Sequence, residues 1–171
     1  METSYVDLYQ VHWPNPRVPI RETMSAMEEM KESGKIVNIG VSNFSLEQTK
    51  EANEALKKSQ ISSNQVDYSL ANRSIERDLL PYCQREGIAV LAYFPLGHGK
   101  LASSAKLLPM SQKYSKTPAQ VGLNWLASKL SVFPIPRASR AVHVRENFGA
   151  SGWQISESDR LGLEAMFAIR G

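Results

Sequence analysis

Segments typical of buried β-strands alternate along the chain with segments typical of helices. Five short apolar runs have the length and composition of strands, namely Tyr5–Trp13, Ile36–Ser42, Ser63–Tyr68, Ala89–Phe94 and Val132–Ile135. Each run is too short for a typical helix and is bounded by polar residues. Strands that alternate with helices predict a parallel sheet joined by crossover helices, because parallel neighbours need a long return connection. We therefore expect an α/β protein.

Capping residues mark the ends of several expected helices. Ser45-Leu46-Glu47-Gln48 has the sequence of a capping box, and Thr117-Pro118-Ala119-Gln120 adds a first-turn proline to the same pattern. Ser74 predicts the N-cap of a helix that ends at Gly87. The segment 98–116 is rich in Ser, Lys and Gly, and we expect a mobile loop there.

The order of these elements fits both a doubly wound sheet and a barrel. No Gly-x-Gly-x-x-Gly motif follows any expected strand, which counts against the dinucleotide-binding fingerprint of the doubly wound class. A chain of 171 residues has enough material for one hydrophobic core. We expect a single domain over residues 1–171.

Composition excludes several classes of function. Lysines and arginines are scattered among acidic residues and leave a net charge of only +3, so we expect no nucleic-acid binding. No apolar run reaches the length of a membrane span, and no metal-ligand spacing occurs. Cys83 is the only cysteine, so no intrachain disulfide can form, which fits a reducing compartment and predicts a cytoplasmic protein.

Polar and aromatic residues follow the expected strands, at the points where each strand ends. The pairs His12-Trp13 and Ser42-Asn43 close the first two strands, Gln65 lies in the third, and Tyr93 closes the fourth. The carboxyl ends of parallel strands share one edge of a sheet, and in barrels the active site is built there. This pattern predicts a site, although polar residues after strands are also ordinary starts of loops.

Two segments carry a family resemblance. Asp-Leu-Tyr-Gln-Val-His-Trp-Pro at 7–14, read with Gly34–Phe44, resembles the aldo-keto reductases, which transfer hydride from NADPH to carbonyls on a (β/α)8 barrel. Gln65–Leu70 and Ala92–Gly97 continue the match. The resemblance implies the C-terminal portion of such a barrel, with about five parallel strand–helix units where the full barrel has eight.

The resemblance also implies roles for the residues at the strand ends. His12 would orient and polarise the substrate carbonyl, and Trp13 would form a wall of the substrate pocket. A neutral imidazole donor suits this task, because negative charge develops on the carbonyl oxygen during hydride transfer. Residues that would hold the nicotinamide are Ser42, Asn43, Gln65 and Tyr93, the last lying flat against the ring.

The remaining cofactor contacts are expected in two later segments. Leu96 and Gly97 fall where the loop of the family follows the pyrophosphate, and Phe94 stands where the family usually has a serine. The run after Pro134 resembles the segment that binds the adenosine 2′-phosphate, where arginines favour NADPH over NADH. The residues implied there are Arg137, Ser139, Arg140, His143, Glu146 and Asn147.

The family supplies an Asp, a Tyr and a Lys before this histidine, and the resemblance places none of them in this sequence. We therefore expect a truncated reductase that is inactive alone, with a small carbonyl compound as the substrate of the whole protein. The alternative is a catalytically inactive NADPH-binding protein that regulates a partner. Unpaired strand edges also predict self-association or pairing with a missing N-terminal half.

Overall fold

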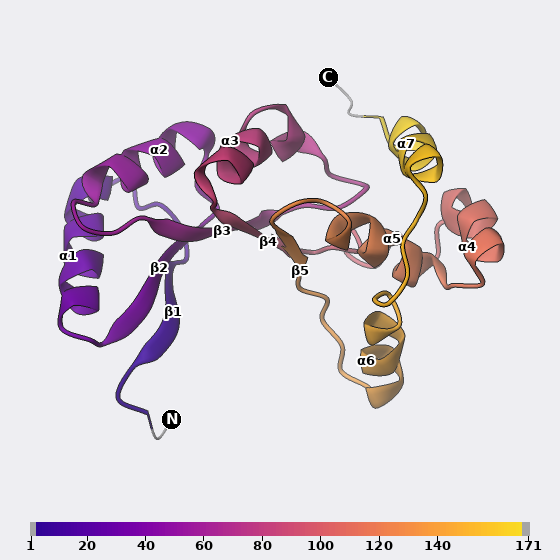
Figure 1. Ribbon diagram of the computed structural model, residues 1–171, viewed down its shortest axis with the longest axis horizontal. Helices are drawn as coiled ribbons and strands as arrows, with labels where there is room; N and C mark the ends of the chain where they lie inside the picture. The colour runs from indigo at the N-terminus through magenta and orange to yellow at the C-terminus, as the bar shows by residue number, and fades with distance from the viewer. Residues whose placement is uncertain (1–2, 169–171) are drawn as a thin grey trace. The chain divides into compact units, whose positions relative to one another are not determined.

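The computed structural model describes residues 3–168 (Figure 1). Strands and helices alternate along the chain, as the sequence predicts. The elements are β1 (Val6–Val11), α1 (Ile20–Glu32), β2 (Ile36–Ser42), α2 (Leu46–Ala55), β3 (Ile61–Asp67), η1 (Ser74–Arg77), α3 (Leu79–Glu86), β4 (Ala89–Tyr93), η2 (Ala105–Leu107), α4 (Leu108–Tyr114), α5 (Pro118–Ala127), β5 (Val132–Pro134), α6 (Ala141–Phe148) and α7 (Glu157–Met166).

The five strands form one parallel sheet in the order β1-β2-β3-β4-β5. Sequence order and sheet order are therefore the same, as in the wall of a barrel. A doubly wound sheet instead reverses its strand order part-way across. This topology confirms the expected parallel α/β class and decides between the two architectures that the sequence leaves open.

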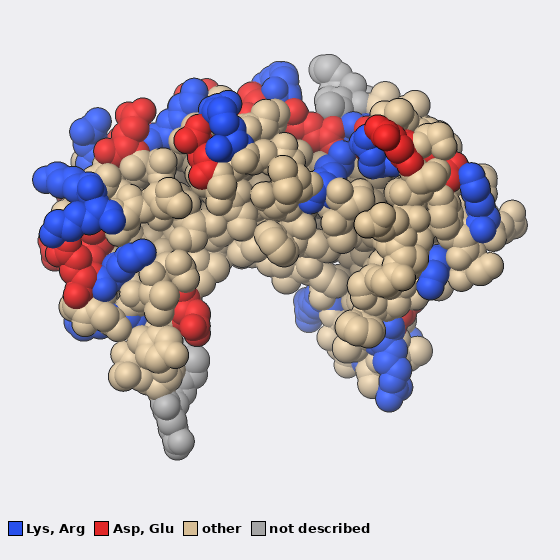
Figure 2. Space-filling model, in the orientation of Figure 1, with Lys and Arg blue, Asp and Glu red and all other residues tan. Residues whose placement is uncertain are grey.

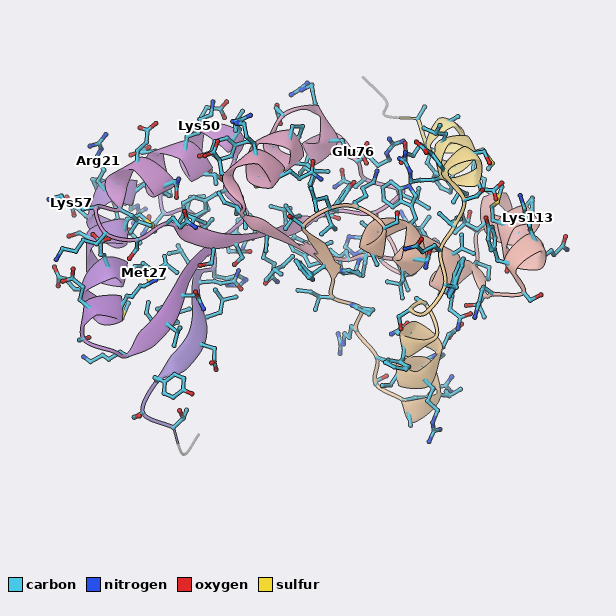
Figure 3. The ribbon with its side chains drawn as sticks, in the orientation of Figure 1. Arg21, Met27, Lys50, Lys57, Glu76 and Lys113 are labelled. Carbon is cyan, nitrogen blue, oxygen red and sulfur yellow. The ribbon has the colours of Figure 1, made fainter. Side chains whose placement is uncertain are left out.

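One compact unit comprises the described residues up to Val66 together with Arg77–Val90. Helices α1 and α2 lie side by side next to its strands, and α1 also packs on β2 (Figure 1). Met24 and Met27 are three residues apart on α1, so both fall on one face of the helix, and both are buried (Met27 is labelled in Figure 3). Lysines, arginines and acidic residues mix over the outer surface of α1 and α2 (Figure 2).

Gly40 lies at the centre of the three-stranded part of this unit. It pairs with Gln10 on β1 and with Ser63 on β3, next to a register irregularity between Ile39 and Gly40. A Cβ atom at Gly40 would come within 2.6 Å of Ser63 Oγ and 2.8 Å of Gln10 Cγ. The Gln10 side chain also donates to Ser63 Oγ over 3.2 Å. The close approach of these side chains requires glycine at position 40.

The second unit comprises Asp67–Glu76 and the described residues from Leu91 onward. Seven of the ten residues of α5 are buried, so this helix forms the centre of the unit. Trp125 of α5 is fully buried and meets the Tyr68 ring edge-on, with 5.6 Å between ring centroids. The capping box expected at Thr117 is present, with Pro118 as the first helical residue.

A cluster of charges and hydrogen bonds ties η1 and α7 of the second unit to the end of α5. Arg73 pairs with Glu76 over 2.5 Å, and Lys129 pairs with Glu164 over 2.9 Å. Tyr68 donates its hydroxyl proton to Glu76. Burial would raise the pKa of Glu76, but the hydrogen bonds from Arg73 and Tyr68 and the charge of Lys129 outweigh it and lower the pKa. The cluster therefore stays ionised.

Two sequence expectations about helices are wrong, one of them only in part. Ser74 opens the short 3-10 helix η1, and Asp78 caps the separate helix α3. The predicted end at Gly87 is confirmed, because Gly87 is the C-cap of α3 with φ of 71°. Pro81, which has no backbone N–H, is the third residue of α3. It fits there because the N–H groups of the first turn have no partner inside a helix. The segment 98–116, expected as a loop, contains η2 and α4, and Leu101 and Leu107 are buried there. These two buried leucines, together with the packing of η2 and α4 against α5, give this polar segment a defined structure.

Among the helices that the structure describes, none is both long enough and apolar enough to cross a bilayer. The described residues also contain no group of three or more His, Cys, Asp or Glu side chains arranged to hold a metal ion.

Replacement of Gly40 by alanine tests the packing of β1, β2 and β3. We expect Gly40→Ala to lower the free energy of unfolding by about 1–3 kcal/mol, because the new methyl group displaces Gln10 and Ser63. Urea unfolding measures this change. Gly162→Ala is the control, since a Cβ at Gly162 of α7 meets nothing within 4 Å. The control should gain roughly 0.5–1 kcal/mol, as alanine favours helices.

Asp159 predicts an acid-dependent part of the stability. A hydrogen bond from Lys113 (labelled in Figure 3), with others from Tyr114 and Ser156, lowers the pKa of Asp159 from near 3.8 to about 2. A lowered pKa stabilises the folded state above pH 3.8, and this contribution is lost as the pH falls towards 2. We expect Asp159→Asn to lower the urea midpoint at neutral pH and to weaken the acid dependence.

Urea titrations of the wild type and this variant, between neutral pH and acid pH, provide the measurement. Glu157→Gln is the matched control, because Glu157 lies in the same first turn of α7 but its side chain is 82% exposed. An acid dependence that is equal in Asp159→Asn and the wild type would contradict the assignment.

Candidate functional site

Polar groups meet at the carboxyl ends of β1, β2 and β3 in the first unit. Ser42 Oγ donates to the carbonyl oxygen of Gln65 over 2.8 Å. Asn43 Nδ2 donates to Ser42 Oγ and to the carbonyl oxygen of His12, each over 3.1 Å. The backbone N–H of Asn43 donates to Gln65 O over 2.9 Å. The structure therefore brings together four of the residues that the sequence singles out.

Asn43 makes these contacts because its backbone is in the left-handed region, with φ of 63°. Asparagine tolerates this conformation better than other residues with a Cβ. The turn directs the side chain back to the end of β1 and the backbone N–H to the end of β3. Asn43 thus links the ends of β1 and β3 by hydrogen bonds, a role that the sequence did not reveal.

His12 and Trp13 follow β1 directly, and both side chains are exposed. Their ring centroids are 6.2 Å apart, with 50° between the ring planes. The backbone carbonyl of His12 is fixed by Asn43, which leaves the imidazole outside this hydrogen bond. An exposed imidazole beside an exposed indole, at the end of a barrel strand, suits the binding of a small polar molecule.

The end of β4, in the second unit, carries an array of three rings. Tyr93 meets Phe94 edge-on at 5.1 Å, and Phe94 stacks on His98 with 3.8 Å between ring centroids. Phe94 and His98 both have positive φ angles, of 48° and 57°. Such a backbone is strained for a bulky residue and often marks a functional segment. Burial and the carboxylate of Asp67 raise the pKa of Tyr93.

A tight turn follows this array and contains Leu96 and Gly97. The N–H of Gly97 donates to the carbonyl of Phe94 over 2.8 Å, and Gly97 has a φ of 55°. A Cβ at Gly97 would lie 3.1 Å from Ala71 Cβ, so the turn leaves little room for a side chain. Leu96 is half-buried and Gly97 is buried.

The first turns of α6 gather the expected phosphate-binding residues. Arg140 is the N-cap residue of α6, and Arg137 and Ser139 lie exposed in the segment before it. Arg140 Nη2 lies 2.8 Å from His143 Nε2, and His143 Nδ1 lies 3.3 Å from Glu146 Oε2. A helix N-terminus favours anions, so this end of α6 is suited to a phosphate group.

Asn147 lies one residue further along α6 and lines an apolar pocket of about 470 Å³. Pro136, Ala138 and Val144 contribute to the same pocket. The rest of the lining is mainly aliphatic, with Phe148 as an aromatic residue and Ser151 as a second polar one. A mainly apolar pocket with a few polar groups has the chemistry that accepts a flat heterocycle. Asn147 is thus placed beside a cavity rather than in the hydrogen-bonded chain of Arg140 and His143.

The sequence did not reveal how these groups contact one another. The spacing of three residues between Arg140, His143 and Glu146 would have indicated neighbouring side chains on a helix. The stacking of Phe94 on His98 had no sequence signal, because it depends on two residues in left-handed conformations.

Comparison with known proteins identifies the family. The model of the aldo/keto reductase family matches residues 1–165. The chain belongs to the aldo/keto reductase family. This membership agrees with the strand order of the sheet, which is that of one part of a (β/α)8 barrel wall.

Several members of this family are similar along the whole chain. Methylglyoxal reductase YeaE of Escherichia coli is 34% identical, over 98% of this chain and 60% of its own length. The thermostable aldo-keto reductase Tm1743, solved with the inhibitor epalrestat, is 39% identical with a TM-score of 0.91, over 96% of this chain and 61% of its own. An aldo/keto reductase from Klebsiella pneumoniae, solved with NADP and acetate, is 34% identical with a TM-score of 0.86, over 97% and 60%. The chain thus spans about 60% of the length of these relatives.

Proposed function

We propose that this chain carries the cofactor-binding part of an NADP(H)-dependent reductase of small carbonyl compounds. Family membership and the strand-end cluster of His12, Ser42, Asn43 and Gln65 together carry the proposal. The relative named methylglyoxal reductase supports a small dicarbonyl as the substrate class of the whole protein. The neighbour solved with NADP supports the choice of cofactor.

The chemistry of the donor set fits this cofactor. Gln65 and Asn43 carry amides and Ser42 a hydroxyl, and such groups can match a carboxamide, which both donates and accepts hydrogen bonds. Tyr93 offers an aromatic face for the nicotinamide ring. Leu96 and Gly97 would lie along the pyrophosphate.

The adenosine end of the cofactor would be held around α6. Arg137 and Arg140 would contact the 2′-phosphate together with Ser139 and His143, because guanidinium groups bind phosphate in a bidentate manner. Glu146 and Asn147 would lie near the adenine, and the apolar pocket beside Asn147 supports this placement.

His12 would act on the substrate rather than on the cofactor. When bound, the reduced nicotinamide supplies the hydride. The imidazole N–H of His12 would donate to the carbonyl oxygen and stabilise the negative charge that develops on it. Trp13, which is 58% exposed, would shield one side of the substrate.

NADPH binding by the purified chain is the decisive test of this proposal. We expect saturable quenching or enhancement of NADPH fluorescence, with weaker binding of NADH because it lacks the 2′-phosphate. Gln65→Ala should weaken binding roughly 3- to 10-fold, as one hydrogen bond contributes about 1 kcal/mol. Gln60→Ala is the control, because Gln60 precedes β3 at its opposite end and is exposed.

A folded sample, verified by circular dichroism and a cooperative urea transition, that does not bind NADPH would overturn the proposal. The same sample, assayed for oxidation of NADPH with methylglyoxal, separates two readings of the chain. Turnover identifies a reductase, whereas binding without turnover identifies the inactive NADPH-binding protein that the family resemblance left as the alternative.

We also propose that the chain associates with itself or with a polypeptide that carries the rest of the barrel, in the cytoplasm. In the first unit, Tyr9 of β1 is 47% exposed, and β1 pairs only with β2 among the described residues. In the second unit, Phe133 of β5 is 55% exposed. Exposed apolar strands at a sheet edge favour association.

Sedimentation velocity of the purified chain tests this association. We expect dimers or larger species whose fraction grows with protein concentration, because edge pairing is a mass-action process. Tyr9→Lys, on the edge strand, should reduce association, since a charged side chain opposes edge pairing. Tyr5→Lys is the control just outside β1, with the same exposure as Tyr9. A compact monomer at all concentrations would argue against the proposal.

A further inference from the structure

Three side chains at the start of α6 form a chain of polar contacts. Arg140 Nη2 lies 2.8 Å from His143 Nε2, and His143 Nδ1 lies 3.3 Å from Glu146 Oε2. His143 therefore stands between a cation and an anion, and its two ring nitrogens face different partners. Figure 2 shows the basic side chains at this end of α6, which Figure 1 labels.

The direction of each contact follows from the chemistry of the groups. A guanidinium has only donors, so His143 Nε2 must accept from Arg140. The imidazole proton then sits on Nδ1, where the carboxylate of Glu146 accepts it. Glu146 thus favours the tautomer with the proton on Nδ1, and this tautomer leaves Nε2 as an acceptor for Arg140. Glu146 therefore influences Arg140 through His143.

We propose that His143 is a positioning residue, which holds the Arg140 guanidinium ready for the phosphate that distinguishes NADPH from NADH. The proposal rests on the proposed function for the identity of the ligand. A flexible arginine on the surface loses side-chain entropy when it binds an anion. The hydrogen bond that Arg140 donates to His143 fixes one N–H of the guanidinium beforehand and leaves its other donors for the phosphate.

A cationic side chain in place of the neutral ring would remove this support. Such a group has no lone pair to offer Arg140. Two cations at the present separation of 2.8 Å would also repel one another. Preference for NADPH over NADH should therefore fall when a permanently charged residue replaces His143.

Few other charges face this group. Arg137 precedes it in the chain, and Arg145 lies on α6, where its side chain is exposed. From α5, which packs against α6, Gln120 reaches this turn and donates to the carbonyl of Glu146 over 3.0 Å. Gln120 is neutral, so the charged partners that contact the His143 ring are Arg140 and Glu146.

An alternative role for His143 is that of a simple cation, and two variants distinguish the roles. His143→Gln places a neutral acceptor near the position of Nε2, whereas His143→Lys places a permanent charge there. Positioning predicts that His143→Gln retains the preference for NADPH within about twofold and that His143→Lys lowers it about 3- to 10-fold, the effect of one hydrogen bond. A role as a simple cation predicts instead that His143→Lys retains the preference for NADPH and that His143→Gln lowers it.

The experiment measures the dissociation constants of NADPH and NADH by fluorescence titration. We expect the ratio of the two constants in His143→Gln to stay within about twofold of the wild type, and the ratio in His143→Lys to fall about 3- to 10-fold. Arg145→Ala is the control for loss of a positive charge on the same helix and should leave the ratio unchanged. Arg140→Ala should abolish the difference between the wild type and the His143 variants.

The outcomes separate this proposal from the proposed function. A chain that binds neither nucleotide refutes the proposed function. NADPH binding whose preference over NADH is lost in His143→Gln, or is retained or raised in His143→Lys, overturns the positioning role and leaves the reductase proposal in place.

Discussion

Parallel pairing of β1, β2 and β3 is the constraint on which the candidate site depends. Backbone N–H and C=O groups of parallel strands are satisfied only by neighbours in register, and this register brings the three strand ends to one edge. At the centre of these three strands, glycine at position 40 allows the Gln10 and Ser63 side chains to lie close together, since any side chain at this position would collide with them. The packing around Gly40, which lies two residues before Ser42, therefore helps to fix the positions of Ser42 and Asn43.

The sequence predicted the strands well because each depends on a short local pattern. Ile36–Ser42 was predicted with the observed bounds, and the capping boxes at Ser45 and Thr117 were confirmed. The error at 98–116 has a physical cause, since Leu101 and Leu107 are buried and η2 and α4 pack against α5, which the polarity of the segment itself cannot reveal. Ser74 was misread because Asp78, four residues later, caps the helix instead.

The sequence indicated which residues gather at the site but not what they do to one another. Ser42, Asn43 and Gln65 were expected to hold a ligand, and the structure adds that Ser42 and Asn43 are already bonded to neighbouring strand ends. His143 and Glu146 were expected as separate cofactor contacts, and they are in contact with each other. Pairwise geometry of this kind follows from rotamers and turns, which a single sequence does not specify.

Asn43 has a consequence for how this protein can change over evolutionary time. The side chain and the backbone turn of Asn43 join the strand ends, and the same residue is part of the candidate site. A substitution of Asn43 that alters ligand preference would also remove hydrogen bonds between the strand ends. Selection for binding and selection for stability would therefore both act against it. Arg140, His143 and Glu146, at the N-cap of α6 and along it, take no part in these hydrogen bonds between strand ends. Under the proposed function, cofactor preference can therefore diverge through substitutions in α6 while the strand ends stay the same.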